Sequence, residues 1–517
     1  MRVAVDVLLG MGLALAVAAQ LARWLRVLQR EHYEPSAPGR FLWRWSCPPV
    51  GAASRRSRRR PVTASIVLVV VVAVLAAAGL DRWAAAATIL YGLACPIGLS
   101  PRGRTGPLRW TRRLTTVAIV AVVLVGVAGV AVAAPHPWLV ALAVVWLVPL
   151  LVGLSAALLG PAENRRAQRF VDQAVARLAK VRPRVVAITG SYGKTSTKSH
   201  LVDLLGSDAG VVASPRSFNN RAGLSRAIND QVSDDTRVFV AEMGTYGPGE
   251  IRALCAWCPP EIAVVTAIGP VHLERMGSLD VVEAAKHEVT ERARAVVLNL
   301  DDERLAGWVA DLVAAGRRVR TAGTSAGADV RVTGDGDSWT LVVDGDARAT
   351  LTRPAGVQTT NAACAVAAAL ELGADVAHVA ARLARLTPVE HRATVATAPS
   401  GVVVIDDTFN ANPAGAVSAL ATLTALASPG RRLVVTPGLV ELGDAAVTEN
   451  RDLGARVAAA NAELVVVGRT NARALLAGFA GEARRVDTRD EAVAWVRATL
   501  GAGDAVLYLN DLPDHYP

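Results

Sequence analysis

Five apolar stretches within the first 160 residues constrain the fold of this 517-residue chain more than any other feature. They span about residues 3–22, 62–80, 83–99, 115–134 and 137–159. Most reach the roughly 20 residues with which an α-helix crosses a hydrocarbon core of ~30 Å. The 83–99 stretch is short and contains Pro96, so a re-entrant or interfacial segment is the alternative there. The pattern predicts a transmembrane segment of about five helices over residues 1–160.

Arginines lie in alternate links between these stretches, and arginine-rich loops stay on the cytoplasmic side of a membrane. One group runs from Arg23 to Arg60, a second from Arg102 to Arg113, and a third follows the last stretch at 165–169. Only Arg2 precedes the first stretch, which argues against a cleaved signal peptide. We therefore expect a multi-pass cell-membrane protein in contact with the lipid bilayer, with everything after about residue 160 in the cytoplasm.

Charge distribution and cysteine spacing argue against a nucleic-acid-binding surface and against a zinc site. The formal net charge is +10, but many of the arginines lie in links between apolar stretches, so we expect no nucleic acid partner. Of five cysteines, only Cys255 and Cys258 form a CxxC pair, and no second pair completes a zinc site. A reduced helix end is the better interpretation of this pair.

From Arg184 onward, short β-branched runs alternate with alanine-rich helical stretches, which is typical of a parallel α/β sheet. A polar stretch around Pro388–Arg392 divides this region in two. We expect a linker at 161–183, a nucleotide-binding central domain at 184–388 and a second α/β domain at 389–517. The predicted strands are Val185–Thr189, Val238–Glu242, Ile262–Thr266, Ala295–Leu298, Val402–Asp406, Leu433–Thr436, Leu464–Val467 and Ala505–Leu509.

The sequence TGSYGKTST, residues 189–197, follows the first of these strands and predicts a phosphate-binding loop. Gly190 and Gly193 would let backbone N–H groups turn toward an anion at the positive end of the next helix. Lys194 would reach the β- and γ-phosphates, and the Thr195 hydroxyl would bind Mg²⁺. Ile188 stands where GxxxxGK[ST] has its first glycine, so a plain glycine turn with an exposed lysine is the alternative.

Two further side chains follow predicted strands, and the carboxyl ends of parallel strands form the ligand crevice of an open sheet. Glu242 closes one strand and could hold Mg²⁺ or orient a water, although a solvated strand end is as common. His272 follows another strand and could be a metal ligand, a base or a loop histidine. Neither residue identifies a reaction by itself.

The order of the motifs is more specific than any one of them. TGSYGKTSTK is followed by NNRAGLS at 219–225, AEMG at 241–244, IGPVHLERMGS at 268–278 and AAKHE at 284–288. This order resembles the Mur ligase family, and DDTFNANP at 406–413 and VELGD at 440–444 are similar to the branch that adds D-alanyl-D-alanine to a muramoyl tripeptide. The resemblance covers about residues 184–510. It implies an α/β protein in which a multi-pass helical membrane segment precedes a P-loop central ligase domain and a Rossmann-like C-terminal ligase domain.

The resemblance also implies roles for individual residues. Catalytic roles would fall to Lys194, His272 and Lys286. Two Mg²⁺ ions would be held by Thr195, Glu242, His272 and Lys286, the last carrying a carbamate derived from CO₂. ATP would be bound by Gly190, Ser191, Gly193, Lys194, Thr195, Ser196, Asn361, Arg392, Asp407 and Asn410.

The reaction implied is activation of a carboxylate by ATP to an acyl phosphate, followed by attack of an amine. The expected partners are a muramoyl-peptide, either UDP-linked or lipid-linked, and an amino-acid or dipeptide amine. Two departures leave the acceptor open: the apolar segment stands where the family binds UDP, and Asn510-Asp511 replace Lys-Gly-Ser. A third departure is His391, which replaces the glycine usual before the nucleotide-binding arginine Arg392. Two alternatives are a cyanophycin- or polyglutamate-type ligase and a membrane NTPase or scaffold without ligase activity.

Overall fold

The structure is a computed structural model of the whole chain. It describes residues 2–46, 67, 70–96, 99, 108–131, 137–206, 209–215, 218–335, 337–354, 356–388, 394–408, 411–426, 430–510 and 512. Two compact units can be distinguished. The first comprises Met1–Arg166, Gly468–Ala474 and Leu512–Pro517, and the second comprises Ala167–Val467 and Leu475–Asp511.

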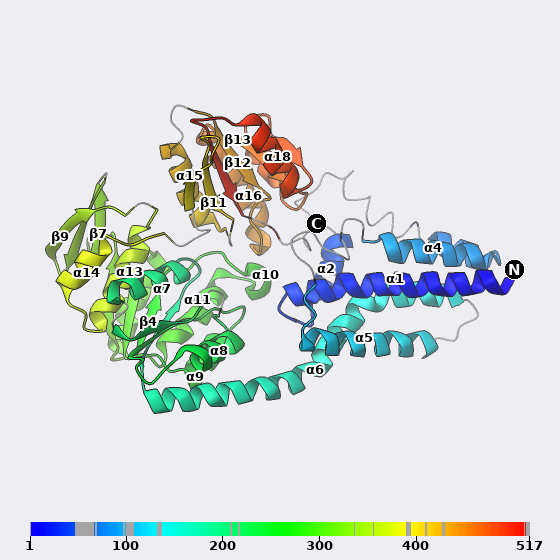
Figure 1. Cartoon of the computed structure of the whole chain (residues 1–517), viewed down its shortest axis with the longest axis horizontal. Helices are drawn as coiled ribbons and strands as arrows, with labels where there is room; N and C mark the ends of the chain where they lie inside the picture. The colour runs from blue at the N-terminus through cyan, green and yellow to red at the C-terminus, as the bar shows by residue number, and fades with distance from the viewer. Residues whose placement is uncertain are drawn as a thin grey trace. The chain divides into compact units, whose positions relative to one another are not determined.

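The first unit is helical. Its elements are α1 (Arg2–Arg30), α2 (Ala37–Ser46), α4 (Asp81–Ala94), α5 (Arg112–Ala131) and the start of α6 (Pro137–Val181), and residues 70–77 are also helical. α1 packs along α4, where the Gln20 amide donates to the Gly92 carbonyl at 2.8 Å. Figure 1 shows α4 running alongside α1. Tyr91 of α4 and Val145 of α6 belong to a small apolar core of this unit. Apolar side chains such as Leu8 and Ile119 are exposed on the outside.

Among the described residues, three helical segments are long and apolar enough to cross a membrane, by length and composition alone: Ala4–Arg30, Arg112–Gly129 and Ala141–Val181. The expected stretch at 83–99 becomes α4, which has 14 residues and ends at Ala94. Part of the expected stretch at 62–80 lies outside the described residues. The last apolar stretch does not end at 159 but continues as helix through 161–181, where the sequence suggested a linker.

The second unit begins with a sheet of nine strands in the order β2-β3-β1-β4-β5-β6-β7-β8-β9. Strands β2 to β7 pair in parallel, whereas β8 pairs antiparallel with both β7 and β9. The four strands predicted in this region are confirmed, but the antiparallel hairpins were not foreseen. The strands are β1 (Arg184–Thr189), β2 (Val211–Ala213), β3 (Val238–Glu242), β4 (Ile262–Val265), β5 (Ala295–Asn299), β6 (Arg318–Gly323), β7 (Val330–Asp335), β8 (Ser338–Val343) and β9 (Asp346–Thr352).

Helices cover both faces of this sheet, because alternate side chains of a strand point to opposite sides. Val186 and Ile188 of β1 belong to one apolar core with Leu201 of α7 (Lys194–Leu205) and the buried face of α13 (Thr359–Glu371). The other core contains Val185 and Ala187 with residues of α8 (Arg221–Gln231), α9 (Glu250–Trp257) and α12 (Glu303–Ala314). Three more helices complete the region: α10 (Leu273–Met276), α11 (Leu279–His287) and α14 (Val376–Leu383).

A second sheet of six strands follows in the order β10-β11-β15-β12-β13-β14. Only β10 runs antiparallel to its neighbour, and the four strands predicted here are confirmed. The fully buried Asn450 side chain binds both the N–H and the C=O of Leu439, which fixes the loop that follows β12. The elements are β10 (Thr394–Thr397), β11 (Val403–Asp407), α15 (Pro413–Leu426), β12 (Arg432–Thr436), α16 (Ala446–Ala459), β13 (Glu463–Val467), α17 (Ala472–Gly478), β14 (Arg484–Val486), α18 (Arg489–Thr499) and β15 (Ala505–Leu509).

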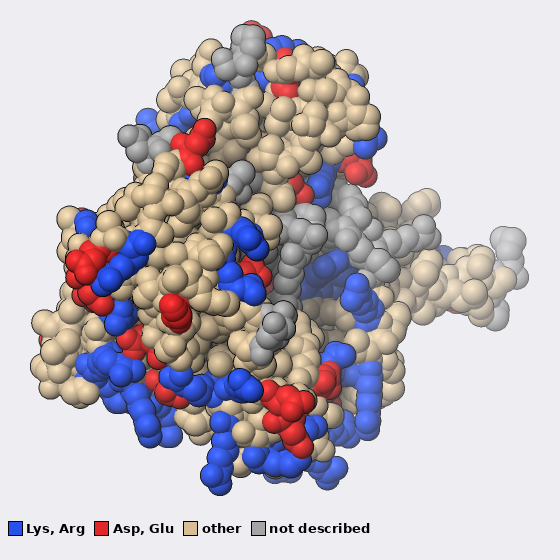
Figure 2. Space-filling view, turned by 60° about the vertical axis from the view of Figure 1, so that its left-hand side comes forward, with Lys and Arg blue, Asp and Glu red and all other residues tan. Residues whose placement is uncertain are grey.

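Figure 2 shows that lysine and arginine side chains are interspersed with acidic ones over the face in view. Surface ion pairs include Arg252 with Glu291 at 2.6 Å and Arg304 with Asp280 at 2.8 Å. Such pairs add nothing to the net charge of +10, which is the excess of lysine and arginine over aspartate and glutamate.

Candidate functional site

The predicted phosphate loop connects β1 to α7. Gly190 and Gly193 have φ values of 147° and 78°, a region that favours glycine. α7 begins at Lys194 directly after Gly193, and no side chain caps its N-terminus. Backbone N–H groups of the first turn of a helix have no partner within the helix, so this 12-residue helix presents donors and a positive dipole end to an anion.

Side chains of the loop hold it in place. The Lys194 ammonium donates to the carbonyl of Gly190 at 2.5 Å and to that of Ser191 at 3.3 Å. Ser191 exchanges hydrogen bonds with the backbone of Gly269, so its hydroxyl joins the loop to the segment after β4. Ser196 lies in the first turn of α7. Lys194 thus lies against the loop backbone, and its role as a phosphate-binding lysine stays a prediction.

Glu242, at the carboxyl end of β3, lies beside this loop and is 3% exposed. Its Oε2 accepts hydrogen bonds from the Thr195 hydroxyl at 3.0 Å and from the Lys198 ammonium at 2.9 Å. Its Oε1 accepts from the Asn219 amide at 3.3 Å. Burial alone would raise the pKa of Glu242, but the charges of Lys198 and Lys194 and the hydrogen bonds from Lys198 and Thr195 lower it overall. Glu242 is therefore a carboxylate, and Lys198 is a contact that the sequence analysis missed.

Thr195 and Glu242 supply oxygen donors of the kind that Mg²⁺ prefers. The described residues contain no group of three or more His, Cys, Asp and Glu side chains that could hold a metal ion. Mg²⁺ is usually bound in proteins by one or two side-chain oxygens together with nucleotide phosphates and water. One such ion fits the residues present at Thr195 and Glu242.

His272 has a different partner. It has a φ of 55° and precedes α10, and its Nδ1 contacts the Glu441 carboxylate of the VELGD segment. The Tyr246 ring lies edge-on to the imidazole with centroids 4.8 Å apart. Glu242 and His272, both predicted to bind Mg²⁺, thus contact different partners in this structure, and the contact with Glu441 was not predicted.

Lys286 is deeply buried near the end of α11, with 1% exposure. Burial, followed by the nearby Lys194 ammonium, lowers the pKa of Lys286 well below its ordinary value. Both causes disfavour the protonated amine. The side chain is therefore inclined toward the neutral form.

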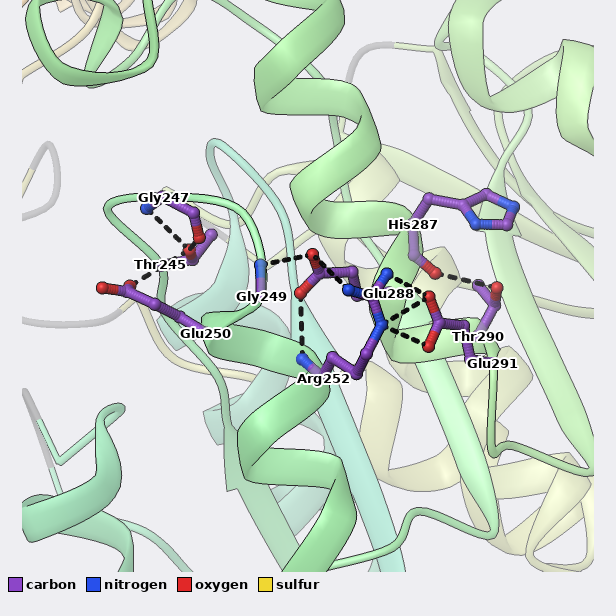
Figure 3. Close-up of polar contacts among 9 residues, drawn as sticks. All are labelled: Thr245, Gly247, Gly249, Glu250, Arg252, His287, Glu288, Thr290 and Glu291. Atoms are coloured by element: carbon purple, nitrogen blue, oxygen red, sulfur yellow. Dashed lines mark hydrogen bonds and ion pairs between the residues drawn. The ribbon is translucent and has the colours of Figure 1, made fainter.

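Glu288, the last residue of the AAKHE motif, contacts the N-terminus of α9 (Figure 3). The buried Glu288 carboxylate accepts hydrogen bonds from the backbone N–H groups of Gly249 at 2.6 Å and Arg252 at 2.9 Å, at the N-terminus of α9. The Arg252 side chain in turn pairs with Glu291. Glu288 thus caps a helix from a distant segment. The motif was quoted in the sequence analysis, but only Lys286 was assigned a role.

The remaining predicted ligands are only partly described. Asn361 is buried on α13, and its amide donates to Gln358 at 3.0 Å. A Cβ atom at Gly193 would collide with the Asn361 amide oxygen, so this residue lies directly against the phosphate loop. Asp407 is buried at the end of β11, in the second sheet. Arg392 and Asn410 lie outside the described residues.

A glycine loop before a helix N-terminus and a buried carboxylate at the end of a parallel strand define a nucleotide-dependent enzyme. Comparison with known proteins narrows the class. Residues 188–369 match the Mur ligase middle domain, and residues 391–509 match the Mur ligase glutamate ligase domain. The chain belongs to the Mur ligase family and is an ATP-dependent, ADP-forming amide ligase.

Several relatives carry one name. The UDP-N-acetylmuramoyl-tripeptide–D-alanyl-D-alanine ligases of Mycobacterium bovis and Mycobacterium tuberculosis are each 37% identical over 367 residues, which is 62% of this chain and 69% of each relative. The crystal structure of MurF ligase from Thermotoga maritima in complex with ADP is similar with a TM-score of 0.59 and 25% identity, covering 67% of this chain and 80% of that one.

The prediction of a multi-pass cell-membrane protein is wrong on this comparison. The MurF ligases to which the chain is similar are soluble cytoplasmic enzymes. By length and composition, three helical segments of the described residues could cross a membrane, and 17%, 28% and 50% of their most hydropathic windows are buried. Length and composition alone are therefore not sufficient to assign a location to this protein.

Proposed function

We propose that this chain joins D-alanyl-D-alanine to UDP-N-acetylmuramoyl-tripeptide, with hydrolysis of ATP to ADP and phosphate. The observation that carries the proposal is the Thr195–Glu242 contact at 3.0 Å beside the phosphate loop, within a chain that matches both Mur ligase domains. The name printed for the mycobacterial relatives supplies the two substrates.

The residues of the loop support the phosphoryl-transfer half of this reaction. In it, the carboxylate of the tripeptide attacks the γ-phosphate, the bond to the β-phosphate oxygen breaks, and ADP leaves. Backbone N–H groups at the start of α7 and the Lys194 ammonium would stabilise charge on the phosphate oxygens. A Mg²⁺ ion held near Thr195 and Glu242 would supply Lewis-acid charge. The amine of D-alanyl-D-alanine then attacks the acyl phosphate, releases phosphate and loses a proton.

Other predicted roles stay proposals. Asn361 would contact the adenine, and Arg392, Asp407 and Asn410 would reach the nucleotide from the second α/β domain. His272 would serve as a second-metal ligand or as the base that takes the amine proton, once released from Glu441. We also keep the domain division at 1–160, 161–183, 184–388 and 389–517, with a P-loop central domain and a Rossmann-like C-terminal domain.

A carbamate on Lys286 is a separate proposal, and the relatives give it no support. The proposed carbamate is favoured by the state of the Lys286 amine: it is buried, and burial and the nearby Lys194 lower its pKa. A neutral amine can add CO₂ to form an anionic carbamate. The test is a ¹³C NMR spectrum of the full chain in ¹³C-bicarbonate, in which loss of a carbamate signal in Lys286→Ala is expected. Absence of any such signal in the parent protein contradicts the modification.

The function is tested by offering the purified full chain ATP, D-alanyl-D-alanine and a muramoyl tripeptide, and by measuring ADP release and the product mass. We expect the UDP-linked tripeptide to gain the mass of the dipeptide minus water. Parallel reactions with a lipid-linked muramoyl peptide, and with polyglutamate or cyanophycin plus their amino acids, compare the other acceptors. Product formed only with one of those acceptors refutes the proposed substrate, and ATP hydrolysis without any amide product refutes the ligase reaction.

A further inference from the structure

Lys198 lies on the same face of α7 as the phosphate-loop lysine, because residues four apart on a helix are neighbours. Unlike Lys194, it does not contact the loop carbonyls but points into the protein, and it is 4% exposed. Its ammonium reaches the Glu242 Oε2 at 2.9 Å, and the side chains of this pair are 5% and 4% exposed. An ammonium and a carboxylate have thus been removed from water together, next to the proposed metal site.

A buried ion pair of this kind is weak evidence for stability, since desolvation offsets much of the attraction between the charges. We therefore interpret the pair as a means of positioning a side chain rather than as a source of stability. The geometry points to Glu242 as its target: Thr195 and Lys198 both donate to the same oxygen, Oε2. Glu242 is therefore oriented toward the Thr195 hydroxyl, while its charge is already balanced by Lys198.

We propose that Lys198 is a positioning residue that holds Glu242 beside Thr195 and makes divalent-cation binding depend on the nucleotide. This inference rests on the proposed function, because it assumes that Thr195 and Glu242 form the Mg²⁺ site. Without nucleotide, a divalent cation meets a carboxylate whose charge is neutralised and a second cation close by. With nucleotide, phosphate oxygens add negative charge and ligands, and the cation can bind beside Thr195 despite Lys198.

The test measures Mn²⁺ binding to the purified full chain by electron paramagnetic resonance, with and without ADP. We expect the parent protein to bind Mn²⁺ weakly alone and much more tightly with ADP. Lys198→Met removes the competing charge, so Mn²⁺ should bind about tenfold more tightly without ADP, which is an ordinary coupling between neighbouring ligands. The enhancement by ADP should shrink correspondingly. Lys198→Arg keeps the charge and should restore the behaviour of the parent.

Activity supplies a second measurement that a purely structural role would not give. With saturating Mg²⁺, Lys198→Met should lower kcat while the KM for ATP changes little, because Glu242 is misplaced but the phosphate loop is intact. Circular dichroism monitors folding of each variant. If Lys198→Met does not fold, Lys198→Gln keeps an uncharged N–H donor on a side chain that is one atom shorter, and is subject to the same prediction.

The outcomes separate this inference from the function on which it rests. Glu242→Gln should weaken Mn²⁺ binding in the presence of ADP. If it does so, but folded Lys198→Met or Lys198→Gln binds Mn²⁺ without ADP no more tightly than the parent, the role of Lys198 is refuted and the metal site stands. If Glu242→Gln leaves Mn²⁺ binding unchanged, the metal site itself is refuted and the inference fails with it. If the Lys198 variants lose affinity for ADP while their Mn²⁺ binding without ADP is unchanged, Lys198 binds the nucleotide phosphates and the inference is overturned.

Discussion

Two acidic contacts in the second unit differ in how they are built. Glu242 and Lys198 form an ion pair with side chains 4% and 5% exposed, and Thr195 and Asn219 add hydrogen bonds. His272 and Glu441 lie in loops, with side chains 26% and 34% exposed. The first contact is enclosed by strand and helix, whereas water can replace either partner of the second. A buried pair fixes the position of a ligand, and a half-exposed pair can be exchanged during a reaction at little cost.

The loop lysine gives the largest expected effect. Lys194→Ala should reduce ligation by about 100-fold or more, because one preorganised cation is lost where charge develops on phosphate oxygens. Initial rates of ADP release with saturating substrates measure this. Lys180→Ala is the matched control, since Lys180 is exposed and pairs with Asp234 on the surface. Ligation at the parental rate in Lys194→Ala would show that Lys194 does not stabilise the transferred phosphate.

The buried pair is broken most directly at the carboxylate. Glu242→Ala leaves the Lys198 ammonium buried and unpaired, so the free energy of unfolding should fall by about 3–5 kcal/mol. Urea denaturation followed by circular dichroism measures the loss. If Glu242→Ala unfolds at the same urea concentration as the parent protein, the Lys198–Glu242 pair is more solvated than its burial indicates.

Glu288 is a second buried carboxylate, and its substitution tests whether a buried acceptor of backbone N–H groups also stabilises the fold. Glu288→Ala leaves the N–H groups of Gly249 and Arg252 without their acceptor, and the free energy of unfolding should fall by about 1–3 kcal/mol. Glu288→Gln keeps an acceptor oxygen and should recover part of the loss. Equal destabilisation by both substitutions would mean that the charge, and not the helix cap, is what the site needs.

The exposed pair should give the smallest effect on stability. Glu441→Gln should change the free energy of unfolding by less than about 1 kcal/mol, since both partners are partly solvated. The same urea titration measures it, with Glu242→Ala as the contrasting variant. A loss as large as that of Glu242→Ala would show that the two contacts are equivalent and that the comparison does not hold.

The parallel strands illustrate what could be predicted and why. Buried strands of a parallel sheet are short apolar runs, and their positions follow directly from the sequence at Val238–Glu242 or Ala505–Leu509. Two strands of the hairpins β7–β9 are not continuous apolar runs and were missed for that reason: β7 mixes polar and apolar residues, and most of β9 is exposed. Apolar helices misled the localisation, since the same composition serves a bilayer and a packed helical unit.

The sequence by itself determined the class of chemistry, because a phosphate loop works through local backbone geometry. Gly190, Gly193, Lys194 and Thr195 are close in the chain, so their spacing alone predicted the loop. Only the tertiary structure decided that Glu242 meets Lys198 and that His272 meets Glu441. Those contacts join residues 44 and 169 positions apart, and which side chains meet there depends on strand order and helix packing that no local pattern encodes.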